Sequence, residues 1–188
     1  MNKDKLKFFW KWTTNIMLGA IIVILFVPSW RVWFSSNLQK VFMGRTELTA
    51  TMKTPLDFSQ ESWMLFDQNQ QIHSFNDFKG KPIVLNFWAT WCPGCRAELP
   101  QIANLKNKFK DEVHFVSVTN ENYDIVKASG EYDLHGDFIY FSPNFSAQFD
   151  FSAYPTTFII DSDFNIVSKV EGASKLDSDE NIKFLMGL

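Results

Sequence analysis

The feature that most constrains this chain is an apolar run at residues 83–88 that leads into two cysteines three positions apart, Cys92 and Cys95. The run is almost entirely apolar, which is typical of a central strand covered on both faces. Helical spacing of apolar residues begins directly after the cysteines and continues through residue 110. The sequence therefore predicts an α/β domain in which the cysteine pair opens the helix that follows a buried strand.

Further elements are predicted on both sides of this unit. Residues 113–118 alternate like a second strand, and a strand, helix and strand of this length predict a parallel pair with a right-handed crossover. The other predicted elements are a strand pair within 62–75, a helix at 123–132, a strand at 138–141, a helical turn at 143–149, a hairpin at 156–170 and a helix at 177–186.

Composition limits the class of protein. A chain of 188 residues with 46% hydrophobic content can form one globular domain and an appendage. The net charge of -3 lacks the basic excess that would suggest nucleic acid as a partner. Two cysteines are too few for the framework of a disulfide-rich secreted domain, and their spacing indicates redox or metal chemistry.

The N-terminal segment has the pattern of a membrane anchor. Residues 12–30 contain no charge, and a helix of about 20 residues crosses the hydrocarbon layer. Lysines before this segment outweigh Arg31 after it, which predicts a cytoplasmic N-terminus. We therefore expect residues 1–11 in the cytoplasm and a single transmembrane anchor at 12–34. The alternative is a cleaved signal peptide, although the bulky residues at 30–34 do not suit a cleavage site.

The remainder of the chain is expected to lie on the extracytoplasmic side. Residues 35–60 are polar and show no sustained period of 2 or 3.6, which predicts a tether. Residues 61–188 contain all the other predicted elements and form the expected domain.

The cysteine spacing assigns chemical roles. The amides and the dipole at a helix N-terminus favour a thiolate, so Cys92 is the expected nucleophile and Cys95 the resolving thiol. Pro93 suits the first helical position, where an N–H group would have no partner.

Other uses of the two cysteines are possible. A zinc site needs two more ligands, and the three histidines are scattered singly. A purely structural disulfide in so small a ring removes little entropy from the unfolded chain. A copper carrier would be expected to have a wider cysteine spacing and a nearby histidine.

The residues around the two cysteines also resemble those of a known family. The sequence Phe-Trp-Ala-Thr-Trp-Cys-Pro-Gly-Cys at 87–95 resembles the active-site strand and turn of the thioredoxin superfamily. The following Arg-Ala-Glu-Leu-Pro is similar to its TlpA/ResA-like branch, the membrane-tethered extracytoplasmic thiol-disulfide oxidoreductases. The resemblance covers roughly residues 57–172. It implies a thioredoxin-like three-layer α/β fold with a mixed central sheet, preceded by one N-terminal transmembrane helix.

The resemblance also implies a substrate-binding loop. The sequence Tyr-Pro-Thr-Thr-Phe at 154–158 resembles the loop whose cis-proline faces the cysteines and docks the substrate backbone. Pro155 would then be cis, and Trp91, Pro93 and Tyr154 would be further substrate contacts. The residues alone would predict a trans turn proline, because most X–Pro bonds are trans.

Two polar residues near the cysteines have implied roles. Asn86 stands where cytoplasmic thioredoxins carry a buried aspartate, so the chain departs from that pattern. Glu98 matches an acid that the ResA-like branch places beside the cysteines, which implies a proton acceptor for Cys95 with a pKa raised by burial. The alternative is a glutamate favoured at a helix start by the dipole.

The expected activity is the reduction of protein disulfides on the periplasmic side of the cytoplasmic membrane. The Cys92–Cys95 disulfide itself would carry the electrons, without a further cofactor or metal. By resemblance, a CcdA/DsbD-type membrane electron carrier would recharge it, and clients could lie in cytochrome c maturation.

The direction of electron flow stays open, because Pro93 and Gly94 match neither thioredoxin nor the strongly oxidising enzymes. The alternatives are a disulfide oxidase or isomerase of the same fold, and a non-catalytic metallochaperone or assembly factor.

Overall fold

The apolar run becomes β4 (Ile83–Phe87), the strand at the centre of the sheet. All five of its residues are buried. It pairs in parallel with β5 (His114–Thr119) and antiparallel with β7 (Thr156–Ile160). Between β4 and β5 the chain forms α3 (Pro93–Phe109), so the predicted strand–helix–strand unit is confirmed.

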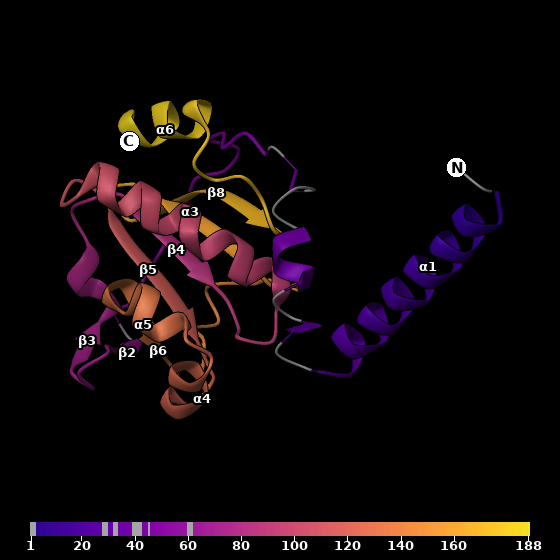
Figure 1. Cartoon of the computed structure of the whole chain (residues 1–188). Coiled ribbons are helices and arrows are strands. Elements are labelled where there is room, and N and C mark those ends of the chain that lie inside the picture. The colour runs from indigo at the N-terminus through magenta and orange to yellow at the C-terminus, as the bar shows by residue number, and fades with distance from the viewer. Residues whose placement is uncertain (1–2, 28–29, 32–33, 39–42, 45, 60–61) are drawn as a thin grey trace.

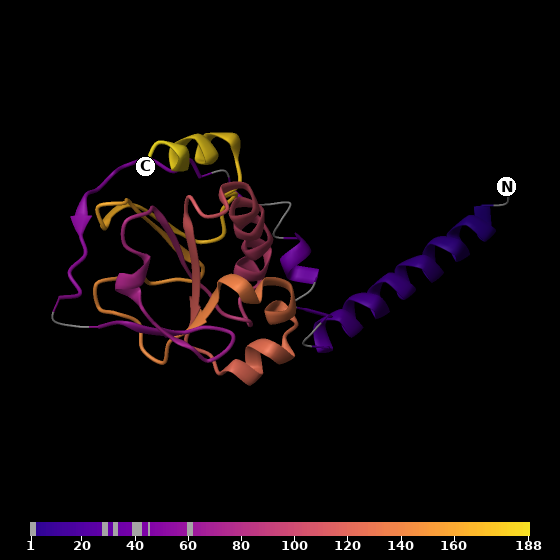
Figure 2. The same cartoon turned by 90° about the vertical axis from the view of Figure 1, so that its left-hand side faces the viewer.

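The computed structural model describes residues 3–27, 30–31, 34–38, 43–44, 46–59 and 62–188 (Figures 1 and 2). Its mixed sheet has eight strands in the order β1-β8-β7-β4-β5-β6-β2-β3. The remaining elements are α1 (Lys3–Phe26), β1 (Thr54–Pro55), β2 (Met64–Phe66), β3 (Ile72–Ser74), η1 (Phe75–Phe78), α4 (Tyr123–Ala128), α5 (Glu131–His135), η2 (Gly136–Phe138), β6 (Ile139–Phe141), β8 (Asn165–Glu171) and α6 (Asp179–Met186).

The two faces of the sheet are covered differently. Side chains of α3, α4 and α6 pack with Val84 and Ile159 on one face. The opposite face holds Leu85 and Phe158 and is covered by η1 and by aromatic side chains from irregular segments. The mixed α/β sheet of the thioredoxin-like fold is confirmed. On the second face, however, the short η1 and aromatic rings from irregular segments take the place of the layer of longer helices that a three-layer fold implies.

Two local predictions need correction. The helix predicted at 123–132 is divided into α4 and α5 at Gly130, whose φ of 80° is outside the helical region. Of the helical turn predicted at 143–149, only a hydrogen-bonded turn at 146–149 is present, where the N–H of Phe149 donates to the Ser146 carbonyl at 3.1 Å, and residues 143–145 are irregular. There the carbonyl of Asn144 accepts hydrogen bonds from the Trp63 indole and the Ser142 hydroxyl, which fix the backbone by side-chain contacts.

The N-terminal segment differs from expectation in part. Figures 1 and 2 show α1 projecting away from the domain. Among the described residues, no helix is both long and apolar enough to cross a membrane. Parts of the predicted anchor and tether, residues 28–29, 32–33, 39–42, 45 and 60–61, lie outside the described residues.

Much of the segment predicted as a tether is fixed to the domain. Gly44 forms a parallel bridge with Ser174, and β1 adds an edge strand to the sheet beside β8. Leu48 is buried in the core on the helical face of the sheet. These contacts use backbone groups and one apolar side chain, so they leave little periodic pattern in the sequence.

Candidate active site

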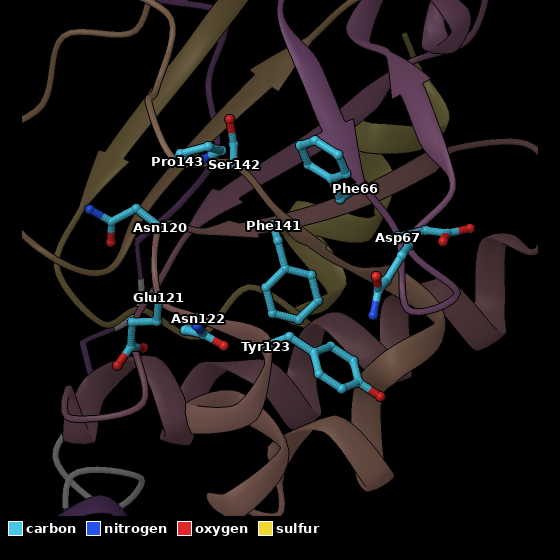
Figure 3. A pocket seen from close by; sticks show the side chains of 10 residues that line it. Phe66, Asp67, Asn120, Glu121, Asn122, Tyr123, Phe141, Ser142 and Pro143 are labelled. Atoms are coloured by element: carbon cyan, nitrogen blue, oxygen red, sulfur yellow. The ribbon is translucent and has the colours of Figure 1, made fainter.

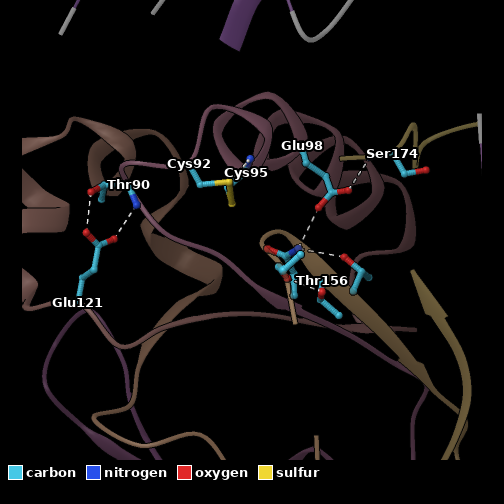
Figure 4. Close-up of a disulfide and its surroundings, with 10 residues drawn as sticks. Thr90, Cys92, Cys95, Glu98, Glu121, Thr156 and Ser174 are labelled. Carbon is cyan, nitrogen blue, oxygen red and sulfur yellow. Dashed lines mark hydrogen bonds between the residues drawn. A yellow bond between two sulfur atoms is a disulfide. The ribbon is translucent and has the colours of Figure 1, made fainter. Parts of the chain in front are cut away.

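The cysteine pair lies where β4 leads into α3 and forms a disulfide in this structure (Figure 4). Cys92 is the N-cap of α3, and its Sγ accepts a hydrogen bond of 3.1 Å from the backbone N–H of Cys95. Pro93 occupies the first turn, as predicted. Of the pair, Cys92 is the more exposed, at 5% against 1% for Cys95.

This placement makes the two sulfurs chemically unequal. An N–H group aimed at Cys92 Sγ and the positive end of the helix dipole both favour negative charge on that sulfur. Cys95 lies inside the first turn and is almost fully covered. The geometry therefore suits attack by Cys92 and resolution by Cys95, the roles predicted from the sequence.

Glu98 lies one helical turn beyond Cys95, close to the same face of α3, and is only 1% exposed. Its Oε2 accepts a hydrogen bond of 2.9 Å from the Asn86 amide, and its Oε1 accepts one of 3.2 Å from the backbone N–H of Ser174. The Asn86 amide also donates to Thr157 Oγ1 at 2.9 Å. The carboxyl group thus sits in a closed polar pocket lined by β4, β7 and the turn after β8.

Burial raises the pKa of Glu98 to about 8. Loss of water around the carboxylate is the largest cause, and it outweighs the hydrogen bonds from Ser174, Asn86 and Thr157, which lower the pKa. This pKa is close to that of an ordinary cysteine thiol, which is about 8.5. A carboxylate with so high a pKa is a stronger base than an ordinary glutamate, which suits Glu98 to accept a proton from a nearby thiol.

The loop before β7 lies at the same end of the sheet as the cysteines, since Thr156 pairs with Phe87. The Tyr154–Pro155 peptide bond is cis, which confirms the expectation from the resemblance. Trp91 is 62% exposed and meets Tyr154 edge to face, with ring centroids 5.6 Å apart. An exposed aromatic surface therefore lies next to Cys92.

Glu121 is a residue near the site that sequence reasoning missed. It follows β5 by two positions, and its carboxylate accepts hydrogen bonds from the backbone N–H and the hydroxyl of Thr90 in the loop before the cysteines. The parallel pairing of β4 and β5 was a usable signal, because it brings the carboxyl ends of both strands to the same edge.

An open hollow with a cavity volume of about 430 Å³ lies beside this loop (Figure 3). Glu121 lies toward one end of the hollow and Asp67 toward the other, with the rings of Phe141 and Tyr123 between them. Both carboxylates already have partners, Thr90 for Glu121 and His73 for Asp67.

A mixed sheet of this topology, with a disulfide at the start of the helix after its central strand, defines a thiol-disulfide oxidoreductase. Residues 49–183 match the Redoxin family, and the chain belongs to that family. The predicted enzyme class and the resemblance to ResA-like proteins are both confirmed.

Individual relatives agree with this classification. The thioredoxin-like protein YneN of Bacillus subtilis is 33% identical over 181 residues, which cover 90% of this chain and 98% of YneN. The thiol-disulfide oxidoreductase ResA of the same organism is 27% identical, with 84% of each chain covered. Among solved structures, a thiol:disulfide interchange protein of Chlorobium tepidum is 29% identical, covers 73% of this chain and 99% of its own, and has a TM-score of 0.57.

Proposed function

We propose that this protein reduces disulfide bonds of protein substrates through the Cys92/Cys95 couple, with Glu98 as the proton acceptor of the resolving cysteine. The observation that carries the proposal is the juxtaposition of the cysteine pair with a buried carboxyl group whose pKa is raised to about 8.

The reaction would proceed in two exchanges. The Cys92 thiolate attacks one sulfur of the substrate disulfide, that disulfide breaks, and one substrate thiolate leaves. Cys95 then gives its proton to the Glu98 carboxylate and attacks Cys92 Sγ. The second substrate thiolate leaves, and the Cys92–Cys95 disulfide forms. The substrate gains two electrons and the protein loses two, so the final state is the disulfide form seen here.

The substrate would dock on the exposed aromatic surface beside the cysteines. Trp91 and Tyr154 offer an edge-to-face aromatic pair, and the cis-Pro155 loop lies at the same end of the sheet. Pro93 completes the rim of this surface at the start of α3. Aromatic rings bury large areas at little cost in side-chain entropy, which suits a surface that accepts several protein substrates.

We further propose that the domain works on the outer side of the cytoplasmic membrane, attached through its N-terminal segment. The support comes from the sequence: 12–30 is uncharged, and lysines precede it. Each turnover would need two electrons from a separate donor, for which a CcdA/DsbD-type membrane carrier is proposed. The topology is tested with a reporter fused after Leu188. Activity of the reporter only in the cytoplasm would overturn this part of the proposal.

Equilibration with reduced and oxidised glutathione tests the direction of electron flow. A potential well below the value of about −120 mV of strongly oxidising enzymes supports a reductant, and a value near it supports an oxidase. Absence of a reversible couple would contradict the redox function. Stoichiometric copper or zinc binding would instead favour a metallochaperone, although within the described residues no group of three or more His, Cys, Asp or Glu is placed to hold a metal ion.

A further inference from the structure

The turn at residues 172–176 connects the two halves of the candidate site. The backbone N–H of Gly172 donates a hydrogen bond of 2.8 Å to the carbonyl of Pro155. Two residues later, the N–H of Ser174 donates to Glu98 Oε1 at 3.2 Å. Gly172 has a φ of 86°, a conformation that favours glycine. A single short turn thus contacts both the substrate loop and the buried carboxyl group.

This turn is held by an N-terminal strap, which we define as residues 43–44 and 46–51. Gly44 forms a parallel bridge with Ser174, and its carbonyl accepts a hydrogen bond of 3.0 Å from the N–H of Lys175. The strap continues past α6 toward β1, and the N–H of Thr51 donates to Val167 of β8 (Figure 2). The segment expected to be a free tether is therefore part of the wall behind Glu98.

Asn181 of α6 joins the strap to the turn. Its side chain is 0% exposed and makes three hydrogen bonds, all to backbone groups. Its Oδ1 accepts from the N–H of Leu48 at 2.7 Å, and its Nδ2 donates to the carbonyls of Thr46 at 3.0 Å and Lys175 at 3.1 Å. A fully buried amide with three backbone partners fixes the relative position of the segments that it joins.

Gln101 of α3 holds the turn from the other side. It lies three residues after Glu98, and its Oε1 accepts a hydrogen bond of 2.9 Å from the N–H of Leu176. Its Nε2 contacts Met43 Sδ at 3.3 Å, so this side chain also touches both the turn and the strap.

We infer that Gln101 and Asn181 are positioning residues for proton transfer at Cys95, because they fasten the strap and the 172–176 turn over Glu98. The turn has no regular secondary structure of its own between β8 and α6. Without these side chains the Ser174 amide withdraws and water enters the pocket. This inference rests on the proposed proton-accepting role of Glu98.

The groups that contact the Glu98 carboxyl are uncharged, so a change in its hydration should appear as a change in the pH dependence of the resolving step. The groups that face it from other elements are uncharged: the Asn86 amide of β4, the Thr157 hydroxyl of β7 and the Ser174 amide of the turn. On its own helix the nearby ionisable groups are Cys92, Cys95 and Arg96, and Arg96 pairs with Glu131 of α5. Lys175 on the turn is exposed, and no charge–charge interaction contributes to the pKa shift of Glu98.

The test follows the resolving step in the reduced full-length protein. Reaction with dithiobis(nitrobenzoate) releases one coloured thiolate when Cys92 attacks and a second when Cys95 resolves the mixed disulfide. The rate of the second release is measured from pH 5 to 10 for the wild type, Gln101→Leu and Gln101→Glu. The last variant keeps an oxygen acceptor for the Leu176 N–H. Asn104→Leu is the matched control, since Asn104 lies one turn further along α3 and bonds Asp177, outside the turn.

For Gln101→Leu we expect the pH profile of the second-phase rate to have its midpoint about half a pH unit or more lower than in the wild type. The reason is that regained hydration lowers the pKa of the Glu98 carboxyl group. Gln101→Glu keeps the acceptor for Leu176 and adds a negative charge near Glu98, so its midpoint should not move toward acid. Asn104→Leu should match the wild type. A wild-type midpoint in Gln101→Leu, or an equal shift in Asn104→Leu, would overturn the inference.

Asn181→Leu provides a second test, in which the midpoint should also move toward acid. If Asn181→Leu does not fold, the result for Gln101→Leu alone supports or overturns the inference. Glu98→Gln separates the two claims. If Glu98→Gln itself keeps the wild-type profile, the proposed role of Glu98 fails. If only Glu98→Gln changes the profile, the role of Glu98 stands and the inference about the turn fails.

Discussion

Asn86 donates a hydrogen bond of 2.9 Å to the carboxyl group of Glu98 and thereby joins the central strand to the helix that carries the cysteines. Both side chains are 1% exposed. An amide at this position can stabilise either protonation state of the carboxyl group, because its Nδ2 donates and its Oδ1 can accept. A second carboxylate there would repel Glu98 in its ionised form. The pair is therefore suited to a single titrating acid beside Cys95.

Glu98→Gln removes the proposed proton acceptor and keeps the size of the side chain. We expect the resolving step to slow by about 100-fold near neutral pH. The pH profile of its rate should no longer have a midpoint near the Glu98 pKa of about 8. The two-phase release of coloured thiolate from dithiobis(nitrobenzoate) measures this effect. Its first phase, attack by Cys92, serves as the internal control. An unchanged rate and profile of the second phase would remove Glu98 from the mechanism.

The raised pKa of Glu98 also predicts how stability depends on pH. The folded protein holds this proton up to about pH 8, whereas an ordinary glutamate releases it near pH 4.5. The folded state therefore binds more protons over that interval, and the free energy of unfolding falls as pH rises through it. The contribution of Glu98 to the free energy of unfolding should decrease by about 5 kcal/mol over this interval. It is fully present below pH 4.5 and lost above about pH 8.

Urea unfolding of the oxidised wild type and oxidised Glu98→Gln at several pH values measures this contribution. The difference in unfolding free energy between the two proteins should shift in favour of Glu98→Gln as pH rises from 5 to 9. A difference that does not change with pH would contradict burial of an ionisable carboxyl group at this position.

Asn86→Ala should raise the pKa of Glu98 further, because a donor to the ionised carboxylate is lost. The loss of two buried hydrogen bonds should also destabilise the protein by about 1–3 kcal/mol. Thr157→Val removes another group that lowers the pKa of Glu98, so its midpoint should move in the same direction. A midpoint for the resolving step that moves toward acid in Asn86→Ala would contradict this account.

The parts of the fold that the sequence predicted are those with a strong local pattern. β4, apolar except for Asn86, and the periodic α3 were predicted within two residues at either end, because burial of both strand faces and one helix face imposes those patterns. The strap could not be predicted in this way. Its contacts with Ser174 and Asn181 are made by backbone groups, which every residue possesses.

The same division applies to the site. Cys92, Cys95 and Pro93 are adjacent in sequence, and their roles follow from the helix start that they share. Thr157 and Ser174, by contrast, reach Glu98 from 59 and 76 residues away. Only the pairing of β4 with β7 and the turn after β8 bring them to the carboxyl group, so tertiary contacts that leave no sequence pattern decide the pKa.

Trp91→Ala tests the aromatic docking surface. Because the Trp91 side chain is 62% exposed, its loss should change the unfolding free energy by less than about 1 kcal/mol. The KM for a disulfide-bonded protein substrate should rise several-fold, while the rate with a small disulfide stays close to that of the wild type. Met186→Ala, at an equally exposed site on α6, is the control. Equal losses with both kinds of substrate would contradict a docking role.

Attack by Cys92 and resolution by Cys95 can be tested by trapping the mixed disulfide between this protein and its substrate. Reduced Cys95→Ser and reduced Cys92→Ser are each mixed with a disulfide-bonded protein, quenched with acid and analysed by mass spectrometry. We expect Cys95→Ser to accumulate a mixed disulfide at Cys92 and Cys92→Ser to accumulate almost none, because the remaining thiol of Cys92→Ser is covered. Rapid adduct formation at Cys95 in Cys92→Ser, with none at Cys92 in the other variant, would contradict these roles.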